Sequence, residues 1–353
     1  MRLLWLWAAW LVLLTGCGTK KDNKDYSSVN KVPLRTTCVG HLLVDLPEGK
    51  ANWEQAFDYA SVRRLPLSVK SLNDFWAVVE DRKAELSTPT PADKESRLVF
   101  AENVDHKAAI LLWREEMVNL DVVDTDRYLW LEGQGYMYQT GALSDADARS
   151  LIPGYIRTFD QLAHIDNSKP PGQAGFCIDG ALIKGEIGKV SASVSVDVPS
   201  WKGVWISAGN SFDDKSRSKL SWEGDSVPRS TADDDFEDLI ENAKENMAED
   251  RDPNKRVASY DVIRKRDRTL GSLKGDEFVV KITFTSGRLA YKLLWQSGYP
   301  GFPSTSDTGF VVQLEAGGLE VTQDFYNPPP AEVDLLAMWD ATLDSLKLRP
   351  ARP

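Results

Sequence analysis

The chain has 353 residues, 42% of them hydrophobic, and a formal net charge of −11. This apolar content supports packed cores and excludes a disordered chain, and the length suits two domains. The negative charge argues against a nucleic-acid partner, which is itself anionic. It is compatible with a basic protein partner or simply with solubility.

Residues 1–16 have the pattern of an export signal. Arg2 is the only charged residue before the first cysteine, a continuous apolar run covers residues 3–14, and Leu-Thr-Gly precedes Cys17. The run is too short to span a membrane as a helix. The motif resembles the lipobox of bacterial lipoproteins, which implies that residues 1–16 are removed and that Cys17 carries lipid. The alternative is an ordinary signal peptide with a cysteine nearby by chance.

The residues after the cysteine predict where the mature protein is held. Gly18 stands where aspartate would resemble an inner-membrane retention signal, so we expect a periplasmic protein anchored at Cys17 to the outer membrane. Residues 17–34 are polar and lack periodicity, which predicts a flexible tether. Fully extended, this tether reaches about 50–60 Å.

Cys38 and Cys177 are the two cysteines that remain once Cys17 is lipidated. Because the periplasm is oxidising, thiols there usually pair. We therefore predict a Cys38–Cys177 disulfide that closes a long loop. The alternative is two buried, unpaired cysteines that act as small apolar residues.

The first half of the chain predicts an α+β domain over residues 35–166. Its expected strands cover residues 42–46, 98–102, 109–118 and 128–139. A capping-box pattern at residues 71–74 predicts a helix that continues to about residue 86. A second helix is expected from Ser144 to about residue 162, with Pro153 causing a kink or a late start.

A Pro/Gly-rich linker at residues 167–175 separates this domain from a second α+β domain over residues 176–353. Its expected strands cover residues 190–196, 278–284, 289–295 and 310–314, with the middle pair forming a hairpin. Helices are expected at residues 236–247 and from about residue 330 to 346. The predicted fold is two similar α+β domains, each an antiparallel sheet with flanking helices, possibly from an old duplication.

The sequence contains none of the common catalytic patterns. It has no nucleophile elbow, Walker loop or dinucleotide-binding glycine motif. His41, His106 and His164 are far apart and form no ligand-spaced pair, so each is expected to be a surface or packing residue. We therefore predict no catalytic residues, no metal, no cofactor and no enzymatic activity.

One loop stands out as a candidate partner surface. Residues 295–303 follow a predicted strand, are rich in Gly and Pro, and carry Trp295, Tyr299 and Phe302. Such aromatics are favoured in binding hot spots, although the loop could instead fold back onto its own domain. The acidic pair Asp213 and Asp214 is a further candidate for partner binding.

Two stretches carry a family resemblance, residues 37–49 (TCVGHLLVDLPEG) and 175–183 (GFCIDGALI). Behind a lipobox, this pairing resembles the two-domain Tli immunity lipoproteins cognate to the fourth Tle class of type VI secretion phospholipases. The resemblance implies a binding protein that grips a cognate lipase effector in the periplasm like a claw, acting on its lid. The family more often has arginine where His41 stands, and no contact residue can be carried over.

Two other functions remain open on the sequence alone. An envelope-assembly or carbohydrate-binding outer-membrane lipoprotein would show an aromatic groove and no lipase partner. An enzyme of another type would need a buried polar cluster with perturbed titration.

Overall fold

The computed structural model describes residues 32–57, 60–89, 96–114, 122–167, 169–184, 189–214, 252–254, 256–297, 306–318 and 326–349. The predicted signal peptide, Cys17, the helix expected at residues 236–247, and the loop residues Tyr299 and Phe302 lie outside this part. Within it, no helix is long and apolar enough to cross a membrane.

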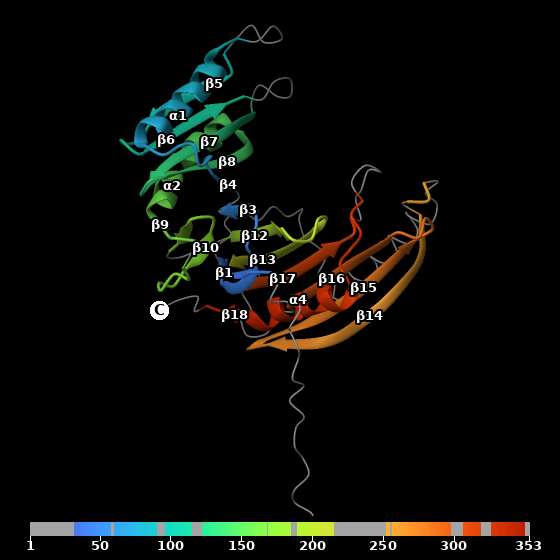
Figure 1. The fold of residues 1–353 in the computed structure, drawn as a ribbon. Coiled ribbons are helices and arrows are strands. Elements are labelled where there is room, and N and C mark those ends of the chain that lie inside the picture. Colours follow the sequence, from blue (N-terminus) through green and yellow to red (C-terminus); the bar gives the residue numbers. More distant parts are fainter. Residues whose placement is uncertain are drawn as a thin grey trace, which may run out of the picture.

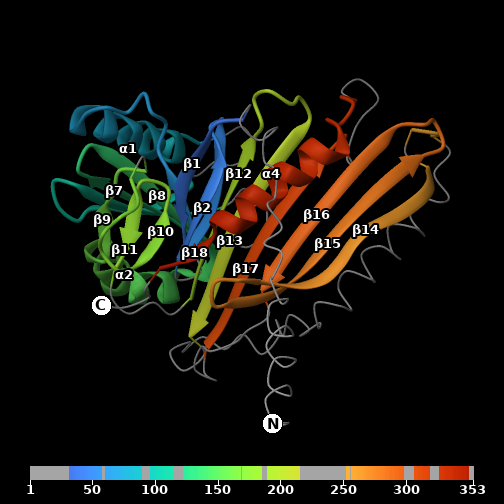
Figure 2. The same cartoon turned by 60° about the horizontal axis from the view of Figure 1, so that its bottom comes forward.

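A twelve-stranded antiparallel sheet forms the frame of the molecule (Figures 1 and 2). In spatial order its strands are β14 (Val257–Leu270), β15 (Leu273–Phe284), β16 (Leu289–Ser297), β17 (Ser306–Ala316), β13 (Val204–Asp214), β12 (Lys189–Asp197), β3 (Ala51–Phe57), β4 (Ala60–Arg64), β8 (Gln134–Ser144), β7 (Val122–Leu131), β6 (Ala108–Trp113) and β5 (Leu98–Asn103). The predicted α+β class is confirmed.

Two small sheets and three helices complete the described fold. One sheet holds β1 (Leu34–Val39), β2 (Leu42–Pro47) and β18 (Lys347–Leu348), and the other holds β10 (Phe176–Ile178), β11 (Ala181–Ile183) and β9 (Leu162–His164). The helices are α1 (Leu72–Ser87), α2 (Asp145–Asp160) and α4 (Glu332–Ser345).

The strands divide into two parts, which we call the arm and the body (Figure 1). The arm is residues 60–164, with α1 and α2 beside strands β4 to β8. The body is residues 34–57 together with 189–349. Strands β1 to β3 therefore belong to the body, where Trp53 of β3 pairs with Val194 of β12. The strand pairing does not follow the predicted division at residues 167–175, because the arm is an insertion between β3 and the rest of the body.

Local sequence signals account for both helices of the arm. Ser71 and Asp74 form the predicted capping box of α1. Ser144 caps α2 by accepting a hydrogen bond from the backbone N–H of Asp147. Helix α2 begins at Asp145, so the late start considered for Pro153 is wrong and the proline lies inside the helix.

One predicted strand of the arm is wrong. The strand expected over residues 128–139 is a hairpin, in which β7 and β8 are joined at Glu132 and Gly133. Both turn residues have positive φ, 45° and 90°, as a two-residue type I′ hairpin requires. The apolar residues on both sides of this short turn made the hairpin resemble a single strand.

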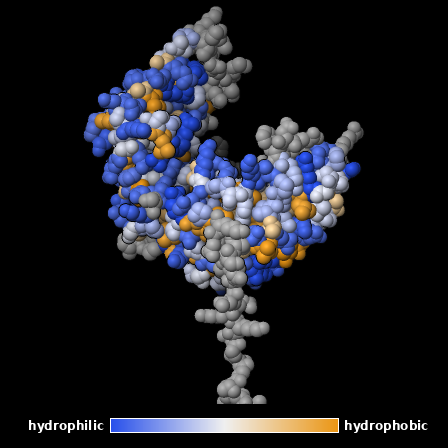
Figure 3. Space-filling model, viewed as in Figure 1, coloured by the Kyte–Doolittle hydropathy of each residue, from blue (hydrophilic) through white to orange (hydrophobic). Residues whose placement is uncertain are grey.

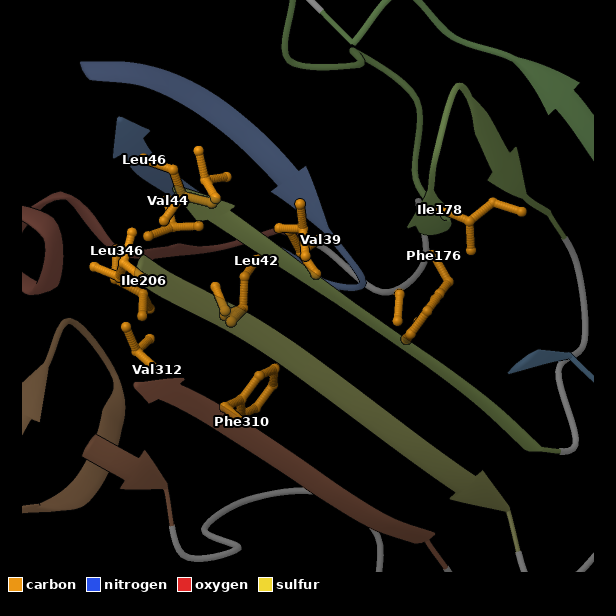
Figure 4. Close-up of a cluster of buried hydrophobic side chains, with 14 of the residues drawn as sticks. Val39, Leu42, Val44, Leu46, Phe176, Ile178, Ile206, Phe310, Val312 and Leu346 are labelled. Carbon is orange, nitrogen blue, oxygen red and sulfur yellow. The ribbon is translucent and has the colours of Figure 1, made fainter. Parts of the chain in front are cut away.

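The core of the body lies between the large sheet and the elements that cover one of its faces. Helix α4 and the β1–β2–β18 sheet pack on the same face of β12, β13 and β17 (Figures 2 and 4). Strand β12 shows why, since Val190, Ala192, Val194 and Val196 are buried and alternate with serines on the other face. This alternation confirms the predicted strand, which has one buried face and one face of serines directed away from the core.

A network of charged side chains lies in this core, between α4 and strands β14 and β15. Glu277 of β15 is fully buried and accepts hydrogen bonds from Arg264, Arg266, Arg268 and Trp339, at 2.6 to 3.2 Å. Burial works to raise the pKa of Glu277, but the hydrogen bonds and charges of the arginines outweigh it and lower that pKa.

Asp340 of α4 joins the same cluster. It accepts hydrogen bonds from Arg264 at 2.9 Å and from Arg268 at 2.7 Å. Burial opposes ionisation here too, yet the two arginines lower the pKa of Asp340. The network thus ties α4 to β14 and β15.

Candidate binding surface

The arm and the body enclose a hollow on one side of the molecule (Figure 3). The face of the body sheet that lies opposite α4 looks into this hollow (Figure 1). We call its central part the floor. It consists of alternate residues on three adjacent strands: Ser191, Ser193 and Ser195 of β12, Ser207, Gly209 and Ser211 of β13, and Val311, Gln313 and Glu315 of β17.

Small side chains keep the centre of the floor flat. Ser193 pairs with Gly209, and Gly209 pairs with Val311 on its other side. A Cβ atom added at Gly209 would lie 3.2 Å from the Ser193 Cβ and 3.3 Å from the Val311 Cγ1, so these three residues share one face at close range. Val311 is 37% exposed. A partner surface can therefore approach the backbone of this sheet closely.

Charged and amide groups border the floor along β16 and β17. Lys292 lies 3.4 Å from Glu315, and the Gln313 Nε2 donates a hydrogen bond to the same carboxylate. The floor therefore offers hydroxyls, amides and an ion pair, which suit hydrogen bonding to another protein.

The back of the hollow is closed by the hairpin of β10 and β11, which we call the brace (residues 176–183). The predicted disulfide is confirmed, and it joins Cys177 of the brace to Cys38 of β1 with a Cα–Cα distance of 5.7 Å. Beside it, the backbones of Gly40 and Cys177 exchange two hydrogen bonds, at 2.9 and 3.0 Å. The brace is thus attached both covalently and through its backbone to the body.

Arg349 lies against this disulfide and was not identified from the sequence. Its Nη1 donates to the sulfurs of Cys38 and Cys177, at 3.2 and 2.9 Å, and to the Gly175 carbonyl. Its Nη2 donates to the carbonyls of Pro171 and Gln173. Burial lowers the pKa of this guanidinium. Arg349 therefore fastens the predicted linker to the end of the body, and no local pattern marks such a role.

His41 is a packing residue, as predicted. It is buried, and its ring packs edge-on against Phe176 with ring centroids 5.1 Å apart. Burial, aided by the charge of Arg349, lowers the pKa of His41 to about 4 although a hydrogen bond with Asn210 opposes the shift. The folded protein therefore holds this imidazole neutral.

Acid is expected to destabilise the protein through His41. Because the folded pKa lies below the unfolded value of 6.5, the unfolded state takes up the proton first, and stability present above pH 6.5 falls as the pH drops toward 4. The full loss is about 3 kcal/mol. Urea unfolding across this range should show a steep pH slope that His41→Gln flattens and that His106→Gln, an exposed control, does not. Equal slopes in both variants would contradict the assignment.

The structure corrects one candidate contact and leaves others open. Trp295 is fully buried on β16, where its Nε1 donates to the Arg268 carbonyl at 3.1 Å, so it is a core residue and not a partner contact. Asp213 and Asp214 end β13, opposite Asp307 and Ser306 of β17. Tyr299 and Phe302 lie outside the described residues.

No metal centre occurs among the residues that the structure describes, since none of their His, Cys, Asp and Glu side chains form a group of three or more able to hold an ion. The candidate site in this part of the chain is the surface that faces the hollow. Its best sequence signal was the run of alternating serines in β12, which predicted a solvated face without revealing what that face borders.

The architecture as a whole resembles that of known proteins. Residues 169–351 match the family described as Tle cognate immunity protein 4 C-terminal domain. The search of curated proteins returned no match. Two solved structures resemble the chain over nearly its full length. The apo structure of immunity protein TplEi of the type VI secretion system from Pseudomonas aeruginosa is 18% identical, with a TM-score of 0.68, and the match covers 92% of this chain and 99% of that one.

A chain from the crystal structure of a Tle4–Tli4 complex is 19% identical, with a TM-score of 0.69 and coverage of 91% and 98%. A third structure, TplEi complexed with an "L" peptide, is 20% identical, with a TM-score of 0.63 and coverage of 90% and 98%. At these identities the structural matches establish a shared fold.

Proposed function

The chain belongs to the Tle cognate immunity protein 4 family, and we propose that it binds and inhibits a type VI secretion lipase effector, protecting the cell that makes it. The family match over more than half of the chain is the observation that carries this function. The Tle4–Tli4 complex, whose immunity chain shares the fold, supports a lipase effector as the partner. The hollow between arm and body supports a clamp that holds the effector.

Inhibition is expected to be stoichiometric. The purified chain, added to a candidate lipase effector, should abolish phospholipid hydrolysis at one equivalent, because a binding protein is consumed as it inhibits. Heat-unfolded chain serves as the control. Full lipase activity at equimolar ratio, for every type VI lipase of the producing strain, would contradict the proposal.

The inhibitor acts by binding and not by catalysis. The floor offers hydroxyls, amides, the exposed Val311 and the ion pair of Lys292 with Glu315, which support recognition of a protein. Contact with the lid of the effector would block substrate entry, because lid opening gates access to lipase active sites. Mass spectrometry of the effector after inhibition should find it intact and unmodified, whereas cleavage or modification would indicate catalysis.

The protein acts in the periplasm and is anchored through lipid at Cys17 to the outer membrane. The lipobox-like sequence at residues 14–17 and Gly18 support this placement, since several acyl chains together anchor a protein stably. Cys17→Ser should abolish metabolic labelling with palmitate and release the protein from the membrane fraction. Retention of label in this variant would contradict the anchor.

The floor of the hollow is proposed to contact the effector, and a bulky charge there should weaken binding. Ser193→Arg places a long cation at the flattest point, beside Gly209, and we expect at least about a tenfold loss of affinity. Val333→Arg introduces the same side chain at an exposed position of α4, on the opposite face, and should leave affinity unchanged. Titration calorimetry compares the two, and equal affinities would remove the floor from the interface.

A further inference from the structure

In the large sheet, the arm and the body are joined by the short pairing of β3 with β4. Strands β3 and β4 share two residue pairs, Ala56 with Ser61 and Phe57 with Ala60, whereas β12 and β13 pair along their whole length. The chain crosses between the two parts a second time at the brace. The angle between arm and body therefore depends on contacts outside this short ladder.

The brace is attached to both parts at once. On the body side, Cys177 is bonded to Cys38 and shares two backbone hydrogen bonds with Gly40. On the arm side, β11 pairs with β9, the strand that follows α2, from Ala181 opposite His164 to Ile183 opposite Leu162. The hairpin thus spans the junction and does not belong to either part alone.

The turn of the brace, Asp179 and Gly180, sits between the two parts. From the body, the buried Gln55 of β3 accepts a hydrogen bond from the Asp179 backbone N–H at 2.8 Å. From the arm, the buried Tyr136 of β8 donates to the Asp179 carbonyl at 3.1 Å. The Asp179 carboxylate accepts from Asn167 at 2.8 Å. One turn therefore bonds to β3 and β8 together.

Gly180 has a backbone conformation and close neighbours that favour glycine. Its φ is +69°, which L side chains rarely adopt. A Cβ atom there would lie 2.3 Å from the Gln134 Oε1 and 2.9 Å from the Tyr136 Oη. A side chain at this position must displace the ends of the Gln134 and Tyr136 side chains or shift the turn, and either change disturbs the contact between the turn and β8.

We propose that the Asp179–Gly180 turn is a positioning element that fixes the angle between arm and body, so that both can contact the effector at once. This inference rests on the proposed function. A fixed angle removes the ordering cost of binding and makes the second contact intramolecular once the first has formed. A loosened turn would leave each contact surface intact but lower the chance that both engage together.

The test is Gly180→Ala, with Gly271→Ala as the matched control. Gly271 has a similar φ of +61°, but no atom lies within 4 Å of its would-be Cβ, so the control introduces the same backbone strain without the collision. Spin labels on non-natural amino acids at Asp81 of α1 and Lys274 of β15 report the arm-to-body distance without disturbing the disulfide. Gln55→Ala, which removes only the body-side hydrogen bond, is the second variant and decides the matter if Gly180→Ala fails to fold.

Wild type and Gly271→Ala should give one narrow distance distribution, and Gly180→Ala a broader or displaced one. Dissociation of the effector from Gly180→Ala should be at least about tenfold faster, with less change in association. Gln55→Ala should move both readouts in the same direction, by less. An unchanged distribution in both variants, or a broadened one with unchanged dissociation, would overturn the proposal. The distance measurement needs no effector, so failure of the wild type to inhibit any lipase would reject the proposed function separately.

Discussion

Replacing Glu277 by alanine is expected to destabilise the protein by about 3–5 kcal/mol, the usual result of removing one partner from a buried ion pair. Three arginines and the Trp339 indole all donate to this one carboxylate, which has no exposed surface. Without it, Arg268 keeps Asp340 and Asp344 as partners and Arg264 keeps Asp340, but the indole and Arg266 lose this acceptor. The cost is the burial of polar groups that have lost their partner.

The matched control is Glu80→Ala on α1. The Glu80 side chain is exposed and has an ion pair with Lys83 at 3.6 Å, so its removal should cost at most about 1 kcal/mol. Urea unfolding at pH 7 measures both variants. Similar losses in the two would show that the buried network contributes no more than a surface pair.

The same carboxylate should also govern stability in acid. The folded pKa of Glu277 lies below 4.5, the ordinary value of a glutamate, so the stabilisation is complete above that pH and is lost as the pH falls through the lower folded value. Most of this window lies below the one expected for His41, which helps to separate the two effects. Glu277→Gln keeps the shape of the side chain and should reduce the low-pH slope, to which Asp340 also contributes because its folded pKa is lowered too, whereas the slope between pH 6.5 and 4 should persist.

The position of Glu277 illustrates where sequence reasoning stops. Alternation along residues 278–284 correctly indicates a strand with one apolar face, and Glu277 falls on the other face, which the pattern marks as wet. Helix α4 covers the face that carries Glu277, and the apolar face is buried too, so both faces of β15 are buried. Because α4 is distant in sequence, no local pattern shows that it lies there.

Local signals predicted much of the local structure, although they missed the short turn between β7 and β8. The cap of α1, the hairpin of β15 and β16 and the alternation of β12 all follow from neighbouring residues. The pairing of β3 with β12 joins residues more than a hundred positions apart, and together with the pairing of β2 with β18 it places the first strands in the body. The predicted domain boundary missed it because a Pro/Gly-rich stretch marks a loop without indicating which strands pair across it.

Trp295 shows the same limit at a single residue. It stands where the strand gives way to a Gly/Pro-rich stretch, and its alternation with Leu293 favoured the core while the loop composition favoured a partner contact. The strand continues to Ser297, so the alternation was the better guide. For the floor of the hollow, the serines were visible in the sequence, but their position opposite the arm depends on the whole fold.

The second large effect is expected on removing the disulfide. The double variant Cys38→Ala and Cys177→Ala should lose about 4–5 kcal/mol of stability, the chain-entropy value for a sequence separation of 139 between the two cysteines. Urea unfolding of the oxidised wild type, the reduced wild type and the double variant measures the loss. Agreement between the last two would assign it to the covalent link, and a loss below about 1 kcal/mol would contradict the entropic account. Mass spectrometry of the non-reduced protein should find the two cysteine peptides joined.

The double variant also separates stability from geometry. In the entropic account the disulfide acts on the unfolded chain, and the folded brace keeps its two backbone hydrogen bonds to Gly40. Arg349 still donates to the carbonyls of Gly175, Pro171 and Gln173. The arm-to-body distance should therefore change little in the double variant while its stability falls sharply, whereas Gly180→Ala should do the reverse. A distance distribution that broadens as much without the disulfide as in Gly180→Ala would show instead that the covalent link, and not the turn, holds the angle.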